Sequence, residues 1–382
     1  MGSHRTPDWN PRDTSVLRDQ RSAYDDMRER CPVAYSEFLD WSLFRHQDIV
    51  GVLADPETYS SASRHLAIPN GMDPPDHTRY RRILESYFQP ERMNVIEPHC
   101  RRIAVDLVQA LLAKGEVEFI TEFAQPFSLT THCVFLGCPP EDWEYLSGWT
   151  HDNQEVALSQ DRELGAALAR GFAGYVTEVL RIRREAGVAA SDDTITSLIQ
   201  STIEGVPLND EEIVSILRNW TAGHGTVATA LGILMFYLGE HRDVQQSLRS
   251  DPTLLPVAID EILRADGPLV INRRTTTRDV EIERRKIDAG EKLTLNWIAA
   301  NRDGRTFDDP ETVRFDREPG NNLLFGAGIH NCLGAPLARL EMRVAMEELL
   351  ARTTTISLSN AEPPRRDIYP SNGFQVLPVH LS

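Results

Sequence analysis

The chain has 382 residues, of which 41% are hydrophobic and 25% are charged. This composition is that of a globular protein, and it excludes a disordered chain, a collagen-like repeat and a disulfide-rich scaffold. The 57 acidic residues outnumber the 40 basic ones, so the formal net charge is −17. Such a balance excludes a protein that coats nucleic acid without sequence preference.

The cysteines and the apolar stretches indicate where the protein resides. Its five cysteines are spaced irregularly, which predicts reduced thiols in the cytoplasm. The longest apolar stretch, about residues 231–238, is far shorter than the ~18 residues that a membrane span requires. We therefore expect a cytoplasmic protein that binds neither membranes nor nucleic acid.

Apolar periodicity predicts helices over most of the first two thirds of the chain. They cover about residues 16–30, 78–88, 97–114, 141–150, 160–186 and 192–204. A long segment from Asn209 to Gly239 then begins with acidic residues, which favour a helix start, and is apolar nearly all round after residue 226. We expect this segment to be a buried central helix.

The rest of the chain mixes helices, strands and loops. A helix is expected at about 242–265, short strands at 270–297, loops at 298–332, a helix at about 333–351, and strand and turn in the last 30 residues. The sum predicts a mainly α fold with a minor β region. No linker or internal repeat marks a domain boundary.

The most informative segment runs from Phe325 to Gly334 and reads FGAGIHNCLG. Its three glycines permit backbone angles that side chains would block. A helix is expected directly after Cys332, and the N–H groups at its start favour the thiolate, which is the form that binds metal. His330 is too close to share a structural zinc with it. A single thiolate suits haem iron, and a buried core cysteine beside a glycine turn is the alternative.

This segment resembles the signature of the cytochrome P-450 family of haem-thiolate monooxygenases, Phe-x-x-Gly-x-His/Arg-x-Cys-x-Gly. The residues that match in order are Phe325, Gly328, His330, Cys332 and Gly334. The resemblance implies the cytochrome P-450 fold, with an N-terminal tail over residues 1–19 and a single haem domain over residues 20–382. It also implies heme b as the cofactor. Cys332 is then the axial iron ligand, His330 contacts a haem propionate, and Phe325 and Gly334 lie against the cofactor.

Two further motifs follow the order of the family. Glu261 and Arg264 share a helix face, and the resemblance joins them to Arg317 in a buried network that fixes the cysteine loop. This role is structural. A solvated surface pair is the alternative for Glu261 and Arg264 alone.

Haem propionates need cationic partners, because buried charges must be paired. His77 and Arg81 lie on one face of a predicted helix and resemble the His-x-x-x-Arg pair on the helix that crosses the haem. Arg274 matches the strand arginine that holds the other propionate. For each of the three alone, a surface basic residue is the alternative.

The central helix contains the stretch AGHGT, from Ala222 to Thr226. Two glycines in an apolar helix cost about 1 kcal/mol each relative to alanine, so we expect a kink or a ligand pressed against the backbone. The resemblance identifies this stretch as the distal oxygen-binding groove. Ala222 and Gly223 then lie against the cofactor, and Thr226 matches the threonine that hydrogen-bonds the dioxygen.

The chain departs from the family at Gly225, where an aspartate or glutamate usually relays protons. His224, Asn219 or ordered water must then substitute, or activity is lower. The Arg-Pro pair of the peroxide-using fatty-acid enzymes is absent.

A substrate pocket is implied by family position. We expect Arg218, Asn219, Ile271 and Phe374 to contribute to it. Because Arg218 and Asn219 lie near the Thr226 face of the central helix, we expect a substrate with a polar or acidic group. Arg218 facing solvent is the alternative.

The resemblance implies a monooxygenase that hydroxylates or dealkylates a small organic substrate with dioxygen. The chain has no flavin or nucleotide motif in a strand–turn–helix context, so electrons are expected from a ferredoxin or flavodoxin with an NAD(P)H-dependent reductase. A basic docking patch is expected from Arg79, Arg82, Arg101, Arg339 and Arg343. Peroxide-driven oxidation and a non-catalytic haem-thiolate binding or sensor protein are the alternatives.

Overall fold

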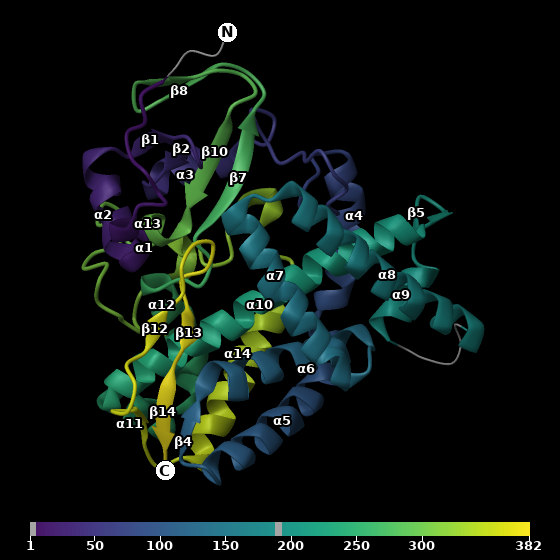
Figure 1. The fold of residues 1–382 in the computed structure, drawn as a ribbon, viewed down its shortest axis with the longest axis vertical. Helices are drawn as coiled ribbons and strands as arrows, with labels where there is room; N and C mark the ends of the chain where they lie inside the picture. The colour runs from purple at the N-terminus through teal and green to yellow at the C-terminus, as the bar shows by residue number, and fades with distance from the viewer. Residues whose placement is uncertain (1–4, 188–192) are drawn as a thin grey trace. The chain divides into compact units, whose positions relative to one another are not determined.

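The computed structural model describes residues 5–187 and 193–382, and it shows a mainly helical chain with a smaller β part (Figure 1). The chain forms two compact units, each built from three separate stretches. The sheet unit comprises Met1–Ser63, Val257–Cys332 and Arg366–Gly373, and the helical unit comprises Arg64–Pro256, Leu333–Arg365 and Phe374–Ser382. The mainly α fold class is thus confirmed. No single cut through the chain separates the two units, and one haem domain over residues 20–382 stays a prediction.

The sheet unit is named for its five-stranded sheet. The strand order is β1 (Val33–Ser36), β2 (Asp40–Leu43), β10 (Lys292–Asn296), β7 (Ile271–Thr276) and β3 (Tyr59–Ser60). Strands β2 and β10 are parallel, and the other neighbours are antiparallel. Leu43 and Leu295 from the sheet and Val52 from helix α3 (His46–Ala54) belong to one buried core cluster.

The helices of the sheet unit are short. They are α1 (Thr14–Arg18), α2 (Gln20–Arg30), α3, α12 (Leu255–Ala265) and α13 (Trp297–Ala300), beside the small hairpin of β8 (Val280–Ile282) and β9 (Arg285–Ile287). The predicted helix at 16–30 is therefore two helices, because Asp19 ends α1 and its carboxylate accepts from the Ser22 N–H to cap α2.

The predicted N-terminal tail, residues 1–19, is folded over its described part. Trp9 is buried, and its ring meets Tyr24 and Phe44 edge-on at 6.2 and 5.3 Å between ring centroids. Helix α1 also lies within this stretch. Residues 1–4 lie outside the described residues. The part of the tail that the structure describes thus adds to the core of the sheet unit.

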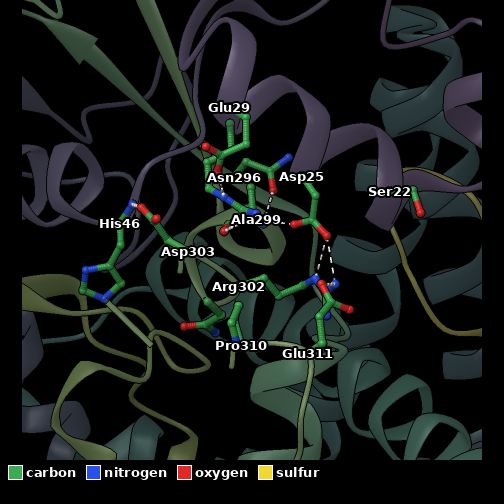
Figure 2. Close-up of polar contacts among 12 residues, drawn as sticks. Ser22, Asp25, Glu29, His46, Asn296, Ala299, Arg302, Asp303, Pro310 and Glu311 are labelled. Atoms are coloured by element: carbon green, nitrogen blue, oxygen red, sulfur yellow. Dashed lines mark hydrogen bonds and ion pairs between the residues drawn. The ribbon is translucent and has the colours of Figure 1, made fainter. Parts of the chain in front are cut away.

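A buried arginine organises the long loop region that follows α13 (Figure 2). The side chain of Arg302 is almost wholly buried and donates from Nε to Asp25 Oδ2 at 3.0 Å and from a terminal nitrogen to the Ala265 carbonyl at 3.1 Å. It also pairs with Glu311. Arg302 therefore joins α2, the end of α12 and the loop, which holds the loop in place although it has little regular structure.

The helical unit consists of long helices and short strands. The helices are α4 (Asp76–Leu84), α5 (Pro90–Leu112), α6 (Gln125–Leu136), α7 (Trp143–Ser159), α8 (Arg162–Ala186), α9 (Thr194–Gln200), α10 (Asp210–Glu240), α11 (Arg242–Ser250) and α14 (Ala335–Arg352). The strands are β4 (Glu116–Glu118), β5 (Thr202–Ile203), β6 (Val206–Pro207), β11 (Ile356–Leu358), β13 (Phe374–Val376) and β14 (Pro378–Leu381). Strand β12 (Arg365–Arg366) falls at a boundary between the units.

Helix α10 is the predicted central helix. Asn209 caps it through a capping box with Glu212, and side chains such as Leu231 and Met235 are fully buried after the acidic first turn. By length and composition alone α10 would pass as a membrane-crossing helix, which the short apolar stretch in the sequence did not indicate. Of its most apolar window, 56% is buried inside the protein, as expected of a core helix.

Several predicted helix limits were wrong, two of them at prolines. The helix expected over 242–265 breaks at Asp251, because Pro252 cannot continue α11 and the Asp251 carboxylate accepts from the Thr253 N–H. The helix expected over 97–114 begins earlier, at Pro90, and continues through Pro98. The 78–88 helix ends at Leu84 and its last four residues form a 3-10 turn. Of the 192–204 prediction, residue 192 lies outside the described residues, and α9 ends at Gln200.

Candidate active site

The loop before Cys332 is shaped by two glycines with left-handed backbone angles. Gly326 and Gly328 have φ values of +69° and +70°. A Cβ at Gly328 would lie 2.5 Å from the carbonyl oxygen of Leu53, at the end of α3. The Cys332 N–H donates to the Phe325 carbonyl at 2.8 Å and closes the loop. Local backbone geometry therefore fixes where the cysteine stands.

Cys332 differs from the other cysteines in its exposure. It is exposed, whereas Cys100, Cys133 and Cys138 are buried and Cys31 is half-buried. Burial raises the pKa of these other thiols, to about 11 for Cys138. Within the described residues, no group of three or more His, Cys, Asp or Glu side chains is arranged to hold a metal ion. One accessible thiol suits a metal cofactor that takes a single protein ligand.

The helix predicted after Cys332 is α14, which begins at Ala335 with Gly334 at its N-cap. Gly334 has no side chain with which to cap the first turn, and Pro336 stands near the start, where a missing N–H costs little. Gly334 is half-buried, and a Cβ there would lie 3.9 Å from the Phe88 ring. Phe325 and His330 are half-buried as well.

Glu261, Arg264 and Arg317 lie together in the sheet unit. Arg264 donates two hydrogen bonds to the Glu261 carboxylate, at 2.8 and 2.9 Å, and Arg317 Nε donates one to the same carboxylate at 2.9 Å. Burial disfavours the charged form of Glu261, but the bonds from both arginines outweigh burial and lower its pKa. The three residues thus form one nearly buried ionic network.

This network reaches the cysteine loop through Asn301. Arg264 donates to the Asn301 carbonyl at 2.7 Å, and the Asn301 side chain accepts from the Leu323 N–H at 2.8 Å. The Leu323 carbonyl in turn accepts from the Gly326 N–H at 2.9 Å. A chain of hydrogen bonds therefore runs from the arginine network to the glycine turn.

Two other predicted residues of the sheet unit lie on strand β7. Ile271 is buried and Arg274 is half-buried. Arg274 donates to the neighbouring Arg273 carbonyl at 2.7 Å. Their roles at a cofactor or substrate stay predictions.

In the helical unit, His77 and Arg81 occupy successive turns of α4, as predicted from their spacing. His77 is buried, and burial together with the nearby charge of Arg81 lowers the pKa of its imidazole. Arg81 is half-buried and donates from Nε to Glu85 at 2.8 Å. Burial therefore favours the neutral form of His77, and Arg81 carries the positive charge of the pair.

The two glycines of the AGHGT stretch would each accept a Cβ without a clash. A Cβ at Gly223 would meet no atom within 4 Å, and Gly223 is exposed. A Cβ at Gly225 would make only ordinary contacts with Thr150 of α7, the nearest at 3.6 Å. Ala222 and Thr226 are half-buried. Packing therefore does not exclude a Cβ at residue 225.

The polar residues expected to bind a substrate group instead hold the chain at residues 66–68. The Asn219 side chain donates to the Ile68 carbonyl at 2.8 Å, and Arg218 donates to the Leu66 carbonyl. Ser215 also accepts from the Ile68 N–H at 2.9 Å. This loop accounts for the polarity of the helix face without a substrate, and the contact of Arg218 and Asn219 with a polar or acidic substrate stays a prediction. Arg218 does not simply face solvent either, because it is half-buried.

His224, predicted to substitute for the missing acid, has a buried side chain. Its Nε2 lies 3.0 Å from Glu341 Oε1 of α14, and its ring stacks on His132 of α6 at 4.3 Å. Neither partner was predicted from the sequence. Two signals were available in the sequence. One is an acidic residue in the apolar face of α14, and the other is a histidine in the apolar helix α6.

Phe374, the remaining predicted pocket residue, is buried on β13. Its ring packs against Phe236 of α10 with centroids 4.7 Å apart. It thus lies beside the central helix, and its contact with a substrate stays a prediction.

The expected basic docking patch is partly neutralised. Arg101 pairs with Glu97, Glu347 and Glu348, and Arg343 pairs with Glu97 and Glu347, at distances of 2.6–2.8 Å. These two arginines therefore offer little uncompensated charge to an acidic partner.

Comparison with known proteins decides the family. The family model described as Cytochrome P450 matches residues 157–379. The chain belongs to the cytochrome P450 family. Erythromycin C-12 hydroxylase of Saccharopolyspora erythraea is 34% identical over 343 residues, which cover 85% of each chain. Cyclomarin C epoxidase of Salinispora arenicola is 32% identical over 87% of this chain and 89% of its own.

The same family accounts for the fold. The structure of a mutant of P450 EryK in complex with erythromycin B superposes with a TM-score of 0.87 and 30% identity, over 96% of this chain and 97% of that one. The chain is thus a cytochrome P450 monooxygenase. The family implies a haem cofactor, an organic substrate, dioxygen and a supply of electrons. An accessible thiol on a closed glycine turn fits that cofactor.

Proposed function

We propose that this cytochrome P450 binds heme b through Cys332 and inserts one oxygen atom of dioxygen into a small organic substrate, releasing the other atom as water. The outcome is hydroxylation or dealkylation. When bound, the haem supplies the iron at which dioxygen is reduced. The observation that carries the proposal is Cys332 itself, an exposed thiol held by a turn that requires glycine at residues 326 and 328.

The cofactor's two propionates are assigned to four basic residues. His77 and Arg81 of α4, Arg274 of β7 and His330 of the cysteine loop are the proposed partners, because a buried carboxylate requires hydrogen-bond donors or cations. Phe325 is proposed to shield the sulfur. Gly334 is assigned to the cofactor as the last glycine of the signature.

The central helix is assigned the oxygen chemistry. Ala222 and Gly223 leave open space for a flat ligand, which the absence of any atom near a Gly223 Cβ supports. Thr226 is proposed to orient dioxygen and its protons through its hydroxyl group. Because Gly225 carries no carboxylate, we expect ordered water to bring protons to this hydroxyl.

Electrons are proposed to come from a ferredoxin or flavodoxin and its NAD(P)H-dependent reductase in the cytoplasm. Such a partner is acidic. Because Arg101 and Arg343 are already ion-paired, we expect it to dock on other basic residues. The proposed reaction consumes two electrons and two protons for each oxygen atom inserted.

The first test concerns the ligand. Cys332→Ser and the control Cys138→Ser are purified, and the Soret band of the reduced protein with carbon monoxide is recorded. We expect the thiolate-type band in the wild type and in Cys138→Ser, and its loss in Cys332→Ser. A Cys332→Ser protein with an unchanged band contradicts the proposal.

The second test concerns substrate and electron source. The ferric protein is titrated with small aromatics, fatty acids, terpenes and steroids. It is also titrated with erythromycin and cyclomarin C, the two compounds that appear in the names of the relatives. Compounds that shift the Soret band are incubated with ferredoxin, reductase and NAD(P)H, or with peroxide alone.

The missing carboxylate at Gly225 supports a second candidate, a peroxygenase. Peroxide brings its own protons and electrons, so this reaction does not need a carboxylate that relays protons. Product with peroxide but not with the redox partners would favour that candidate. Product only with the partners supports the monooxygenase. No product by either route would indicate a haem-binding protein without catalysis.

A further inference from the structure

Three titratable side chains from three helices meet inside the helical unit. His132 of α6, His224 of α10 and Glu341 of α14 have exposed fractions of 1%, 7% and 0%. We call them the α10 anchor. None of the three matches a motif of the cysteine loop, and only His224 was singled out in the sequence.

The anchor is held by short contacts. His224 Nε2 lies 3.0 and 2.9 Å from the two carboxylate oxygens of Glu341. The ring of His132 lies against that of His224, with centroids 4.3 Å apart and planes inclined by 25°. His132 Nε2 is 3.0 Å from Thr221 Oγ1, one turn earlier on α10. Ser128 of α6 donates to the His224 carbonyl at 3.1 Å.

The charge state of the anchor follows from its burial. Burial lowers the pKa of His132 far below its usual range, so this imidazole is neutral. Burial raises the pKa of Glu341, and His224 offsets this only in part. In the part of the chain that the structure describes, no lysine or arginine pairs with Glu341. Glu341 therefore holds its proton more readily than an exposed carboxyl group does.

Among the described residues, two other titratable groups face the pair. Cys100 of α5 faces Glu341, and both burial and the Glu341 charge raise its thiol pKa. Glu97 of α5 acts on Cys100 in the same direction. His132 faces the pair from α6. The Nδ1 of His132 is buried and has no hydrogen-bond partner among the described residues, so the site has capacity for one more donor or acceptor, such as a water molecule.

His224 lies between two glycines that make almost no side-chain contact. A Cβ at Gly223 would meet nothing within 4 Å, and one at Gly225 only Thr150. Glycine lowers helix stability, and glycine-rich points are where helices kink. Between Gly223 and Gly225, His224 alone attaches α10 to neighbouring helices by its side chain.

We propose that His224 and Glu341 are positioning residues, which lock the glycine-rich centre of α10 and so fix the direction in which Thr226 presents its hydroxyl group. The role rests on the proposed function of Thr226. For this role, the α10 anchor needs a hydrogen-bond acceptor at residue 341 rather than a negative charge. It explains why a histidine stands at 224 with its side chain turned away from the exposed face of Gly223.

The test compares Glu341→Leu with Glu341→Gln in the haem-loaded protein. Glutamine keeps an acceptor for the His224 N–H, whereas leucine removes it. The matched control is Glu348→Leu, because Glu348 is also a buried carboxylate on α14 but pairs with Arg101 and Arg352. Hydrogen–deuterium exchange of peptides that cover residues 220–230 measures how firmly the α10 anchor holds this segment. The measurement does not depend on turnover.

We expect Glu341→Leu to speed exchange in this segment about tenfold or more, the effect of losing one buried hydrogen bond. Peroxide released per NAD(P)H should rise and kcat should fall, while KM stays unchanged. Glu341→Gln should match the wild type in all three, and Glu348→Leu should leave the segment unchanged. If Glu341→Leu does not fold, His224→Phe removes the same bond.

Two results would overturn the proposal. The first is unchanged exchange in Glu341→Leu or His224→Phe. The second is a Glu341→Gln protein as impaired as Glu341→Leu, which would assign the ionised carboxylate itself to the reaction. If the wild type shows no turnover but Glu341→Leu still exchanges faster, the proposed function is wrong. The role of the α10 anchor in holding the helix would still be supported.

Discussion

His224 and Glu341 are hydrogen-bonded at 3.0 Å inside the helical unit, and Glu341 is completely buried. A buried carboxylate with a raised pKa makes stability depend on pH. Because the folded protein keeps a proton that the unfolded chain has released, it loses stability as pH rises from the ordinary carboxyl pKa of 4.5 towards the raised value. Below 4.5 both states hold the proton, and this contribution no longer changes with pH.

We therefore predict that Glu341→Gln stabilises the protein more at high pH than at low pH. Glutamine resembles the protonated acid at every pH, so the difference in Tm between variant and wild type should grow as pH rises above 4.5. Thermal unfolding followed by circular dichroism across a pH series measures it. A Tm difference that shrinks with rising pH would show that Glu341 is ionised in the folded protein.

The Glu261–Arg264–Arg317 network predicts a large loss of stability on truncation. Arg264 has no exposed side-chain surface and donates two hydrogen bonds to Glu261. We expect Arg264→Ala to lower the free energy of unfolding by about 3–5 kcal/mol, since it leaves a buried carboxylate with one cation fewer. Urea denaturation measures the change.

The matched control for Arg264→Ala is Arg181→Ala, which removes an exposed ion pair with Glu178 on α8. It should leave the urea midpoint unchanged. Equal effects of the two substitutions would contradict a special role for the buried network.

Much of the candidate site follows from local sequence. The turn glycines, the helix after Cys332 and the start of α10 each depend on residues within a few positions, where backbone angles and capping act directly. The contact between Glu261 and Arg264 likewise follows from their helical spacing. Arg317 comes from a distant loop, and only the order of motifs brought it into the prediction.

The features that the sequence did not predict depend on partners far along the chain. Glu341 and His224 meet because α10 and α14 pack together. The apolar periodicity of a helix does not show which other helix it packs against. The polarity of Arg218 and Asn219 was assigned to a substrate, whereas the carbonyls of residues 66–68 accept their hydrogen bonds. Backbone carbonyls are present at every residue, so a sequence gives no sign of which ones a side chain will bind.

The two turn glycines predict different sensitivities to alanine. Gly326 and Gly328 both have positive φ, which costs an alanine about 1–2 kcal/mol. Only at Gly328 would the new Cβ also collide with backbone, since it would lie 2.5 Å from the Leu53 carbonyl oxygen. We expect Gly328→Ala to lower the urea midpoint and the haem content more than Gly326→Ala. Equal losses would show that backbone angle alone decides.

The surroundings of Gly225 permit a direct test of the missing acid. A Cβ there would lie 3.6–3.9 Å from the side chain of Thr150, which is ordinary contact, and φ at Gly225 is not positive. Gly225→Glu should therefore fold, and a helical glycine replaced by a better helix former should stabilise the protein by up to about 1 kcal/mol. Gly225→Gln is the matched control, because it adds the same bulk without a titratable group.

If proton supply near Thr226 limits the reaction, Gly225→Glu should raise the product formed per NAD(P)H and lower the peroxide released, and Gly225→Gln should do neither. The measurement is product, peroxide and NAD(P)H consumed in the same reaction with ferredoxin and reductase. Improvement by both variants would mean that filling the space beside Thr150, rather than supplying a proton, is what matters. No improvement by either would mean that water already brings protons to Thr226 fast enough, and that the glycine costs this enzyme nothing in coupling.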